Sequence, residues 1–325
     1  MAKPLPIPQL KPDSLVSACL AVIIETRISE IASFKHGVLN GDIEHIHDMR
    51  VACRRLQTVL MIFSETIAKS KLVPFKKQLR RLTRRLGAVR QLDVLMEILS
   101  GRLQAADDKE RTVCNLLFAR YSTSRKEAFD KTLNFLIETE SAQLFEKFIA
   151  AVNISRGGKK KSIRSSVAKS TFAETMRDSI GDLADDFASA VAAARKNDDS
   201  IEMLHKMRIT GKPLRYAMEL AETVYPGGFK DYFQEIKSII QLVGNVHDID
   251  VAFVSLDSFR KELQSYNEVA GERIDRFPIG FLVDAHEELD VRRNTLLTEI
   301  HKILHEWRQD RFFKTFIALI HGIAV

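Results

Sequence analysis

The stretch HIHDMRVACRRLQTVLMIF, residues 45–63, returns in modified form as LHKMRITGKPLRYAMEL, residues 204–220. At a constant offset the two stretches pair His47 with His205, Met49 with Met207, Arg50 with Arg208, Arg54 with Lys212 and Leu56 with Leu214. Matching residue types at matching positions indicate an internal duplication. We therefore expect the fold to contain the same helical unit twice.

Each copy of this motif carries three basic residues at positions i, i+3 and i+7. These positions share one face of an α-helix, because the helix has 3.6 residues per turn. One basic stripe consists of His47, Arg50 and Arg54, and the other of His205, Arg208 and Lys212. We expect the ligand to contact both stripes.

A second pair of similar stretches follows the first pair: LGAVRQLDVLMEIL at residues 86–99 and VGNVHDIDVAFVSL at residues 243–256. Here Gly87 pairs with Gly244, Val89 with Val246, Arg90 with His247, Asp93 with Asp250 and Val94 with Val251. Two matched motifs in the same order argue against chance similarity.

Together the motifs resemble the CHAD domain family, the conserved histidine α-helical domain. Its pattern is His-x-x-Arg-x-x-x-(Lys/Arg)-x-Leu, followed by a basic helix that ends near Arg-Asp-x-Asp-Val. The resemblance covers both halves of the chain. It implies an all-α protein with twofold pseudo-symmetry that binds inorganic polyphosphate in a central basic cavity, with polyphosphate granules of a prokaryotic cytoplasm as a location.

The chain departs from the family pattern at a few positions. His247 replaces an arginine, Gln91 replaces an aspartate, and Gln57 stands opposite Arg215 across the repeat. These departures question how much the second half contributes to polyphosphate binding, more than they question the fold. CHAD domains often accompany triphosphate-hydrolysing CYTH domains, whose Glu-x-Glu-x-Lys strand is absent here, and this absence favours a binding protein over an enzyme.

Composition describes a globular protein with an excess of positive charge. The chain has 325 residues, 45% of them apolar and 28% charged, with a net charge of +6 and a pI near 9.1. That length exceeds what one core usually supports, so two halves are expected. Cys19, Cys53 and Cys114 are widely spaced, which argues against disulfides and a zinc cluster and suits a reducing cytoplasm. Because neither a signal peptide nor a membrane-spanning apolar run is evident, we expect a cytoplasmic protein with no membrane partner.

Helical periodicity without strand-like alternation predicts an all-α fold of two pseudo-twofold-related, antiparallel helical bundles of the four-helix-bundle type. The predicted parts are an extended lead-in (1–12), a first half (13–154), a basic flexible linker (155–166) and a second half (167–325). The linker's Lys159, Lys160, Lys161 and Arg164 are interpreted as a solvated connector, a polyanion-binding arm, or both.

Turn and capping signals predict the limits of the helices. A first helix capped by Asp13 or Ser14 ends near Gly37, a second runs to about Lys69, and a third opens at Pro74. Further helices are expected over about 103–139, 141–153, 167–196, from the turn 197–200 to before Pro226, 228–262, 283–307 and 312–323. Pro213, inside the second motif helix, predicts a local bend.

The third predicted helix is strongly basic, with no acidic residue between Glu65 and Asp93. Its like-charged neighbours at i, i+4 spacing repel one another, and a bound anion would relieve that repulsion. Guanidinium groups match phosphate oxygens, so this helix and the two stripes predict phosphate binding. The predicted polyphosphate contacts are His47, Arg50, Arg54, Lys76, Lys77, Arg80, Arg81, Arg84, Arg85, Arg90, His205, Arg208, Lys212, Arg215, Lys237 and His247.

Two repeated residue types have competing interpretations. His47 and His205 are either structural or phosphate donors; as donors they would be charged by a polyanion, which predicts tighter binding below neutral pH. Asp93 and Asp250 suggest a carboxylate dyad, but each is more simply the partner of a basic side chain in its own half. Met49 and Met207 are predicted core residues.

Other functions use the same residues differently. Nucleic-acid binding requires similar electrostatics, but no base-stacking motif is present. Phosphotransfer through His47 or His205 would need an acidic magnesium site, which the sequence lacks. Metal binding by the pairs His45, His47 and His301, His305 lacks further ligands. We therefore expect a non-catalytic protein with no metal and no cofactor.

Overall fold

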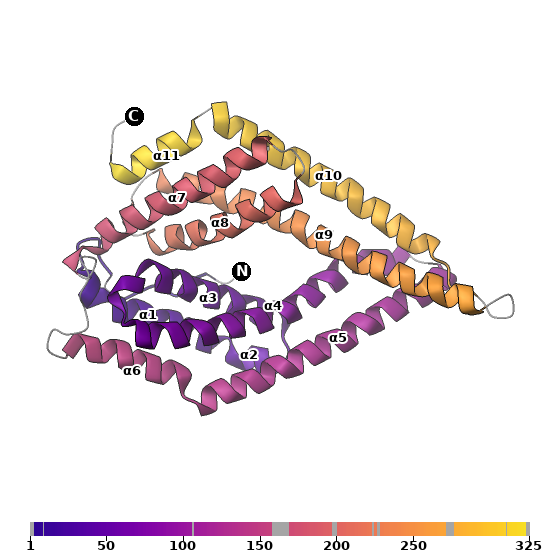
Figure 1. Cartoon of the computed structure of the whole chain (residues 1–325), viewed down its shortest axis with the longest axis horizontal. Helices are drawn as coiled ribbons and strands as arrows, with labels where there is room; N and C mark the ends of the chain where they lie inside the picture. The colour runs from indigo at the N-terminus through magenta and orange to yellow at the C-terminus, as the bar shows by residue number, and fades with distance from the viewer. Residues whose placement is uncertain are drawn as a thin grey trace.

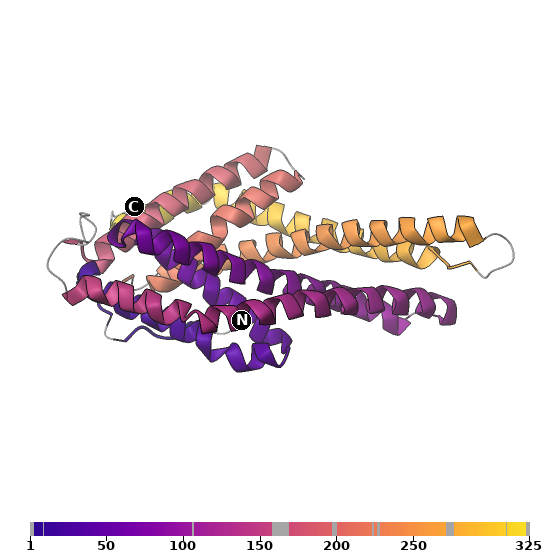
Figure 2. The same cartoon turned by 60° about the horizontal axis from the view of Figure 1, so that its bottom comes forward.

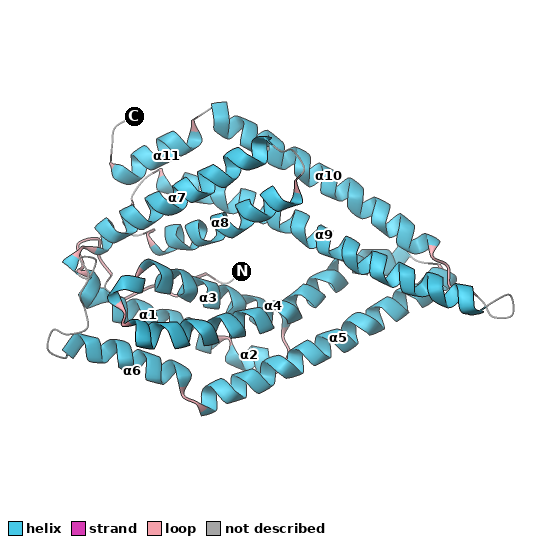
Figure 3. Ribbon diagram, in the orientation of Figure 1, coloured by secondary structure: helices cyan, strands magenta, loops and turns pink. Residues whose placement is uncertain are grey.

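All regular structure that the computed structural model describes is helical (Figure 3). The described residues are 3–8, 10–105, 107–157, 169–196, 200–222, 224–225, 228–270, 276–309 and 311–322. Within these ranges no strand is found, only one isolated backbone bridge. The predicted all-α class is confirmed.

The helices form two successive sets (Figure 1). The first set comprises α1 (Val16–Ser33), α2 (Lys35–Leu39), α3 (Ile43–Ile62), a 3-10 turn (Ser64–Thr66), α4 (Lys69–Ala105), α5 (Asp108–Ser141) and α6 (Leu144–Gly157). The second comprises α7 (Phe172–Lys196), α8 (Ile201–Leu220), α9 (Phe229–Ala270), α10 (Gly280–Gln309) and α11 (Phe312–His321).

The two sets have matching neighbours, as a pseudo-twofold arrangement requires. α3 packs on α1 and α4, as α8 packs on α7 and α9; α4 pairs with α5 as α9 pairs with α10; α6 lies on α1 as α11 lies on α7. The starts of α1 and α7 exchange backbone hydrogen bonds: Val16 N donates to Ser170 O at 3.0 Å, and Phe172 N donates to Ser14 O at 2.7 Å. α3 also contacts α8, and α4 contacts α9, so the halves face each other through their motif helices.

The two motif helices begin at equivalent caps. The Asp42 side chain accepts a hydrogen bond from His45 N at 2.8 Å, and the Ser200 side chain accepts one from Met203 N at 3.4 Å. Each oxygen satisfies a backbone N–H that the first helical turn leaves unpaired. Equivalent caps give the two basic stripes the same position along their helices.

Two apolar cores hold this arrangement. The larger lies among α1, α3, α7, α8 and the adjoining parts of α4 and α9, and it includes Met49 and Met207, both 1% exposed as predicted. The smaller lies farther out, where α4 and α5 meet α9 and α10. In Figure 2 these long helices extend together to one end of the molecule. There Tyr121 Oη lies 2.7 Å from Ser255 Oγ, linking α5 to α9.

Several predicted helix limits are wrong. The first predicted helix divides at Phe34 into α1 and α2, and α3 ends at Ile62 rather than near Lys69. α4 begins at Lys69, so Pro74 lies inside it. A proline near a helix start removes a single backbone hydrogen bond, which a long packed helix tolerates. α8 continues through Pro213, which lies inside this helix as predicted.

Two further predictions are corrected: the residue that caps α1 and the start of the linker. The N-cap of α1 is Leu15, without a side-chain cap, and Ser14 Oγ instead accepts from Lys11 N. α6 extends to Gly157, into the predicted linker. The linker's basic residues, with the turn residues 197–199 and with Pro226, lie outside the described residues.

One helix is longer and more apolar than the sequence analysis expected. The segment Phe229–Val269 could cross a membrane by length and composition alone, with a mean hydropathy of 1.3 in its most apolar window. This is weak evidence, because core helices of soluble proteins pass the same test. In the structure α9 packs against α8 and α10.

Candidate functional site: a basic cavity between the halves

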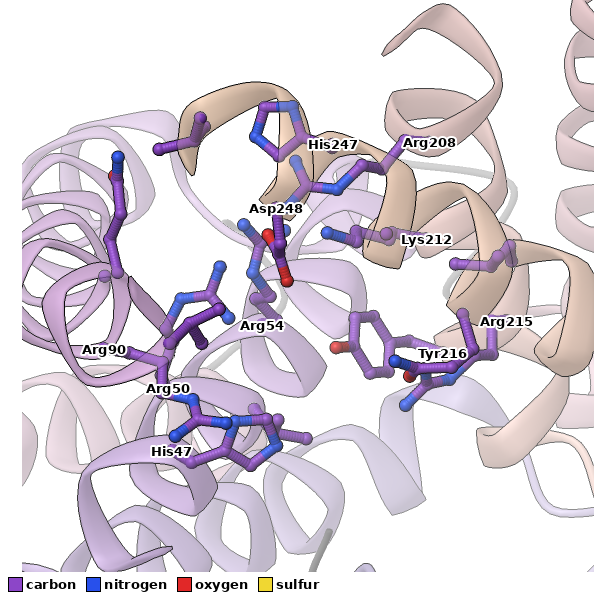
Figure 4. Close-up of a pocket in the computed structure, with 18 of the residues that line it drawn as sticks. His47, Arg50, Arg54, Arg90, Arg208, Lys212, Arg215, Tyr216, His247 and Asp248 are labelled. Atoms are coloured by element: carbon purple, nitrogen blue, oxygen red, sulfur yellow. The ribbon is translucent and has the colours of Figure 1, made fainter. Parts of the chain in front are cut away.

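A cavity with a volume of about 210 Å³ lies where α3 and α4 face α8 and α9, and it is partly open to solvent (Figure 4). We call it the central cavity. Its predicted residues are His47, Arg50, Arg54, Arg90, Arg208, Lys212, Arg215 and His247. Both halves contribute basic side chains: the whole first stripe lines the cavity, and of the second stripe Arg208 and Lys212 do so, whereas His205 does not.

The stripes point into the cavity because the opposite faces of their helices are core. Along α3, Met49, Cys53 and Leu56 are at most 1% exposed. Arg50 and Arg54 occupy the remaining face and are half-buried. A Cβ atom at Gly87 of α4 would lie 3.4 Å from Arg50 Nε, so the absence of a side chain there leaves room for the guanidinium.

Burial and mutual repulsion depress the pKa values of three cavity cations, Arg50, Arg208 and Lys212. The pKa of Arg50 is lowered to about 10, first by burial and then by Arg54. The pKa of Lys212 is lowered to about 6, first by burial and then by Arg208, Arg54 and Arg50. Burial also lowers the pKa of Arg208. The cavity by itself is thus electrostatically unfavourable for the charged forms of these three side chains.

Several of these side chains lack the hydrogen bonds that buried polar groups normally make. Arg50 Nε, Arg54 Nε, Arg208 Nε and His47 Nδ1 are buried, and none has a hydrogen-bond partner among the described residues. A buried donor without a partner costs about 1–3 kcal/mol. Four such atoms around one cavity are what a site for an anionic ligand requires.

The histidines differ from what the sequence analysis assumed. Burial and Arg90 lower the pKa of His47 to about 4, and burial and Arg208 lower that of His247 to about 4. Both are neutral in the empty cavity near neutral pH. His205 is exposed and lies outside the cavity lining, with its ring centroid 5.9 Å from that of His247.

A second, smaller hollow of about 180 Å³ adjoins the central cavity. We call it the side cavity. It shares Arg54, Lys212 and Tyr216 with the central cavity and adds Lys76 and Arg80 of α4. The two hollows therefore lie side by side, with the basic side chains of Arg54 and Lys212 at their common boundary.

The other predicted basic residues lie elsewhere. On the α5 side of α4, Arg81 and Arg85 stack over the Phe135 ring, with guanidinium carbons 5.0 and 5.2 Å from its centroid, and Arg85 donates to Lys131 O at 2.9 Å. Lys77, Arg84 and Lys237 line neither cavity. A helix that is basic on several faces can turn only one of them toward the cavity.

Tyr216 and Asp248 are among the cavity residues that the predicted set lacks. Tyr216 is buried and lines both cavities, and Asp248 projects a carboxylate into the central one (Figure 4). The sequence held a signal for Asp248, since the second motif aligns it with Gln91, another lining residue. Tyr216 carried no repeat signal.

The repeated aspartates act as predicted, each as the partner of an arginine in its own half. Asp93 of α4 accepts a hydrogen bond from Arg125 Nε of α5. Asp250 of α9 accepts one from Arg293 Nε of α10 at 2.7 Å. These pairs connect α4 to α5 and α9 to α10. Since each aspartate has its own arginine partner, the two do not form a carboxylate dyad.

The structure adds no metal ligands to the histidine pairs considered above. His45 Nδ1 lies 2.8 Å from Asp42 Oδ1 at the cap of α3, and His305 Nε2 lies 2.9 Å from the Gln309 amide nitrogen. In the part of the chain that the structure describes, no three His, Cys, Asp or Glu side chains gather where they could hold a metal ion.

Two matching helical halves with a basic cavity between them define the structural class of this protein. The chain belongs to the CHAD domain family, whose model matches residues 22–257. Its structure is similar to the crystal structure of the CHAD domain from the plant Ricinus communis, with a TM-score of 0.67 and 20% sequence identity over 94% of this chain and 96% of that one.

A further solved structure, PptA from Streptomyces chartreusis, matches with a TM-score of 0.63 and 15% identity, covering 91% of this chain and all 100% of the other. At these identities the likeness concerns the fold. Comparison with curated proteins finds no match to the chain.

Proposed function

We propose that this protein binds inorganic polyphosphate in the central cavity, without catalysing a reaction on it. The observation that carries the proposal is the set of buried nitrogen atoms without a partner among the described residues: the Nε donors of Arg50, Arg54 and Arg208, and His47 Nδ1, which donates in one tautomer of the ring. A phosphate polymer offers closely spaced oxygen acceptors, and each charge-assisted hydrogen bond to them would relieve a buried donor. Membership in the CHAD family supports the same ligand, because the resemblance implies polyphosphate binding.

The side cavity supports a polymer rather than a single phosphate ion. A chain of phosphoryl groups could continue from the central cavity past Arg54 and Lys212 to Lys76 and Arg80. Counterions released from the polymer would contribute to the affinity, so binding should weaken steeply as salt rises.

The proposal is tested by competition between long-chain polyphosphate and single- and double-stranded nucleic acid of equal charge, over a range of salt concentrations. The test variant combines Arg50→Ala with Arg208→Ala. We expect wild type to prefer polyphosphate, and the variant to lose at least about a hundredfold in polyphosphate affinity, because two charge-assisted contacts are removed. Circular dichroism checks that the helices persist.

The matched control combines Arg81→Ala with Arg84→Ala, which removes the same charge from α4 outside both cavities. We expect this control to lose less than about tenfold. Equal losses in the two variants, or equal competition by nucleic acid, would show that the basic surface of α4 binds polyanions generically. Nucleic-acid binding would then be the better account.

In cells, the proposed function places the protein on polyphosphate granules. A fluorescently tagged wild type should colocalise with stained granules, and the variant with Arg50→Ala and Arg208→Ala should spread away from them. Colocalisation that is indifferent to these substitutions would separate granule targeting from the central cavity.

A further inference from the structure

Asp248 is an acidic residue in a cavity otherwise suited to anions. Its carboxylate lies on α9 and projects between the side chains of α3 and α8 (Figure 4). The charged and titratable groups around it are Arg208 and Lys212 of α8, Arg50, Arg54 and His47 of α3, Arg90 of α4, and its neighbour His247.

A structural role as a salt-bridge partner does not account for Asp248. Asp93 of α4 and Asp250 of α9 each accept a hydrogen bond from an arginine. Asp248 has neither a hydrogen bond nor an ion pair to any described residue, and it feels Arg208 and Lys212 only through longer-range attraction. Its carboxylate oxygens are therefore available to a ligand.

A carboxylate repels a fully ionised phosphoryl group, but it accepts a hydrogen bond from one that carries a proton. In a polyphosphate chain only the terminal phosphoryl group has a second ionisable oxygen, with a pKa of about 6 by analogy with phosphate monoesters. Internal phosphoryl groups have none. One proton shared between Asp248 and a terminal oxygen would replace a repulsion with a short O–H···O hydrogen bond.

We propose that Asp248 makes the central cavity a site for the terminal phosphoryl group of a polyphosphate chain, with the following groups lying in the side cavity toward Arg80. This inference rests on the proposed function and adds a specificity that the cations alone lack. The pseudo-symmetric position supports it: Gln91 lines the same cavity and carries no charge, so only one carboxylate, on one side, selects the chain end.

The test uses isothermal titration of the full-length chain with linear tripolyphosphate and with cyclic tetrametaphosphate, a ring of similar charge that has no chain end. Wild type should bind the linear compound more tightly, by on the order of tenfold or more. Asp248→Asn should bind the ring more tightly than wild type does and should lose most of the preference. A purely electrostatic role would instead raise both affinities by the same factor.

The matched control is Asp257→Asn, which removes one exposed carboxylate, paired with Arg260, from the same helix. It should keep the wild-type preference. Equal binding of linear and cyclic compounds by wild type, or an unchanged preference in Asp248→Asn, would overturn the role of Asp248 while leaving polyphosphate binding in place. Failure of wild type to bind any of these compounds or long-chain polyphosphate would overturn the proposed function itself.

A wild-type measurement makes the inference independent of whether Asp248→Asn folds. Linear tripolyphosphate esterified at both ends has lost the second ionisable oxygen of each terminal phosphoryl group, but it keeps one ionised oxygen on every phosphoryl group and its linear shape. It should bind wild type as weakly as the ring does. Binding as tight as that of the free-ended compound would show that Asp248 does not read the chain end.

Discussion

Arg55 of α3 and Glu219 of α8 form a two-point ion pair across the boundary between the halves. Arg55 Nε donates to Glu219 Oε2 at 2.7 Å, and Arg55 Nη2 donates to Glu219 Oε1 at 2.9 Å. Arg55 also pairs with Glu30 of α1, and Glu30 pairs with Arg27. Arg55, Glu30 and Arg27 are each at most 5% exposed, so this buried network fixes α3 against α8.

Removing one partner of this network should destabilise the protein strongly. Glu219→Ala leaves the Arg55 charge buried with fewer partners, and we expect a loss of about 3–5 kcal/mol in the free energy of unfolding, measured by urea denaturation. Glu140→Ala is the control, because its partner Lys35 and Glu140 itself are exposed, and its loss should stay below about 1 kcal/mol. Similar losses in both variants would mean that the buried network does not hold the halves together.

At Gly211 the backbone of α8 lies close against side chains of α7 and α9. An added Cβ atom would lie 2.8 Å from Ile240 Cγ1 and 2.9 Å from Phe187 Cε2, so Gly211→Ala should lower the unfolding free energy by about 1–3 kcal/mol. At Gly244, also within a helix, nothing lies within 4 Å, and Gly244→Ala should raise it by up to about 1 kcal/mol. Thermal unfolding of the pair provides the comparison. Equal shifts would show that α8 can move away from α7 and α9 at little cost.

Lys212 should lower the free energy of unfolding while it strengthens polyphosphate binding. Burial and nearby arginines lower its pKa to about 6, whereas an unfolded lysine has a pKa near 10.5. Between these values the unfolded chain binds more protons, so this residue destabilises the fold progressively as pH falls from about 10.5 to about 6. Lys212→Met should therefore raise the unfolding free energy near neutral pH by on the order of 1 kcal/mol while weakening polyphosphate binding.

The control for this trade-off is Lys237→Met, which removes a half-buried lysine of α9 outside both cavities. Its effects on the free energy of unfolding and on polyphosphate affinity should both be smaller than those of Lys212→Met. If Lys212→Met weakens polyphosphate binding but does not raise the free energy of unfolding, the cavity does not disfavour the charged form of this lysine.

Polyphosphate binding should be coupled to proton uptake. Lys212 is largely neutral above about pH 6 in the empty cavity, and a bound polyanion would favour its charged form. Titration in buffers of different ionisation enthalpy should show uptake approaching one proton near pH 8, and affinity should increase as pH falls from about 8 toward about 6. Lys212→Arg, which stays charged, should bind with much less uptake.

The histidines should contribute to this pH dependence only in more acidic solution. His47 and His247 have pKa values of about 4 in the empty cavity, so a ligand must raise them by more than about two units before they matter near neutral pH. His47→Gln should still show the increase in polyphosphate affinity as pH falls from about 8 to about 6. If His47→Gln abolishes it instead, the original interpretation, in which the histidines control the pH dependence, is correct.

Local patterns were sufficient for the helical class, for the two stripes and for the prediction that Asp93 and Asp250 each pair with a basic side chain in their own half, but not for the identity of those partners, Arg125 and Arg293. A stripe at i, i+3 and i+7 follows from helix geometry, and a single acid in a basic helix finds a cation nearby. The errors at Pro74 and Phe34 have a different origin, because whether a helix continues through a proline or breaks at a turn depends on the packing around it.

The sequence by itself therefore determined which helices repeat and which of their faces are basic, since these depend on residue spacing alone. Only the tertiary structure decided which basic face of α4 meets the cavity, because Arg81 and Arg85 pack against α5 while Lys76 and Arg80 face α8. It also decided that Asp248 lies among cations without an ion pair to any described residue. Such placements depend on contacts between residues far apart in the chain, which no local period encodes.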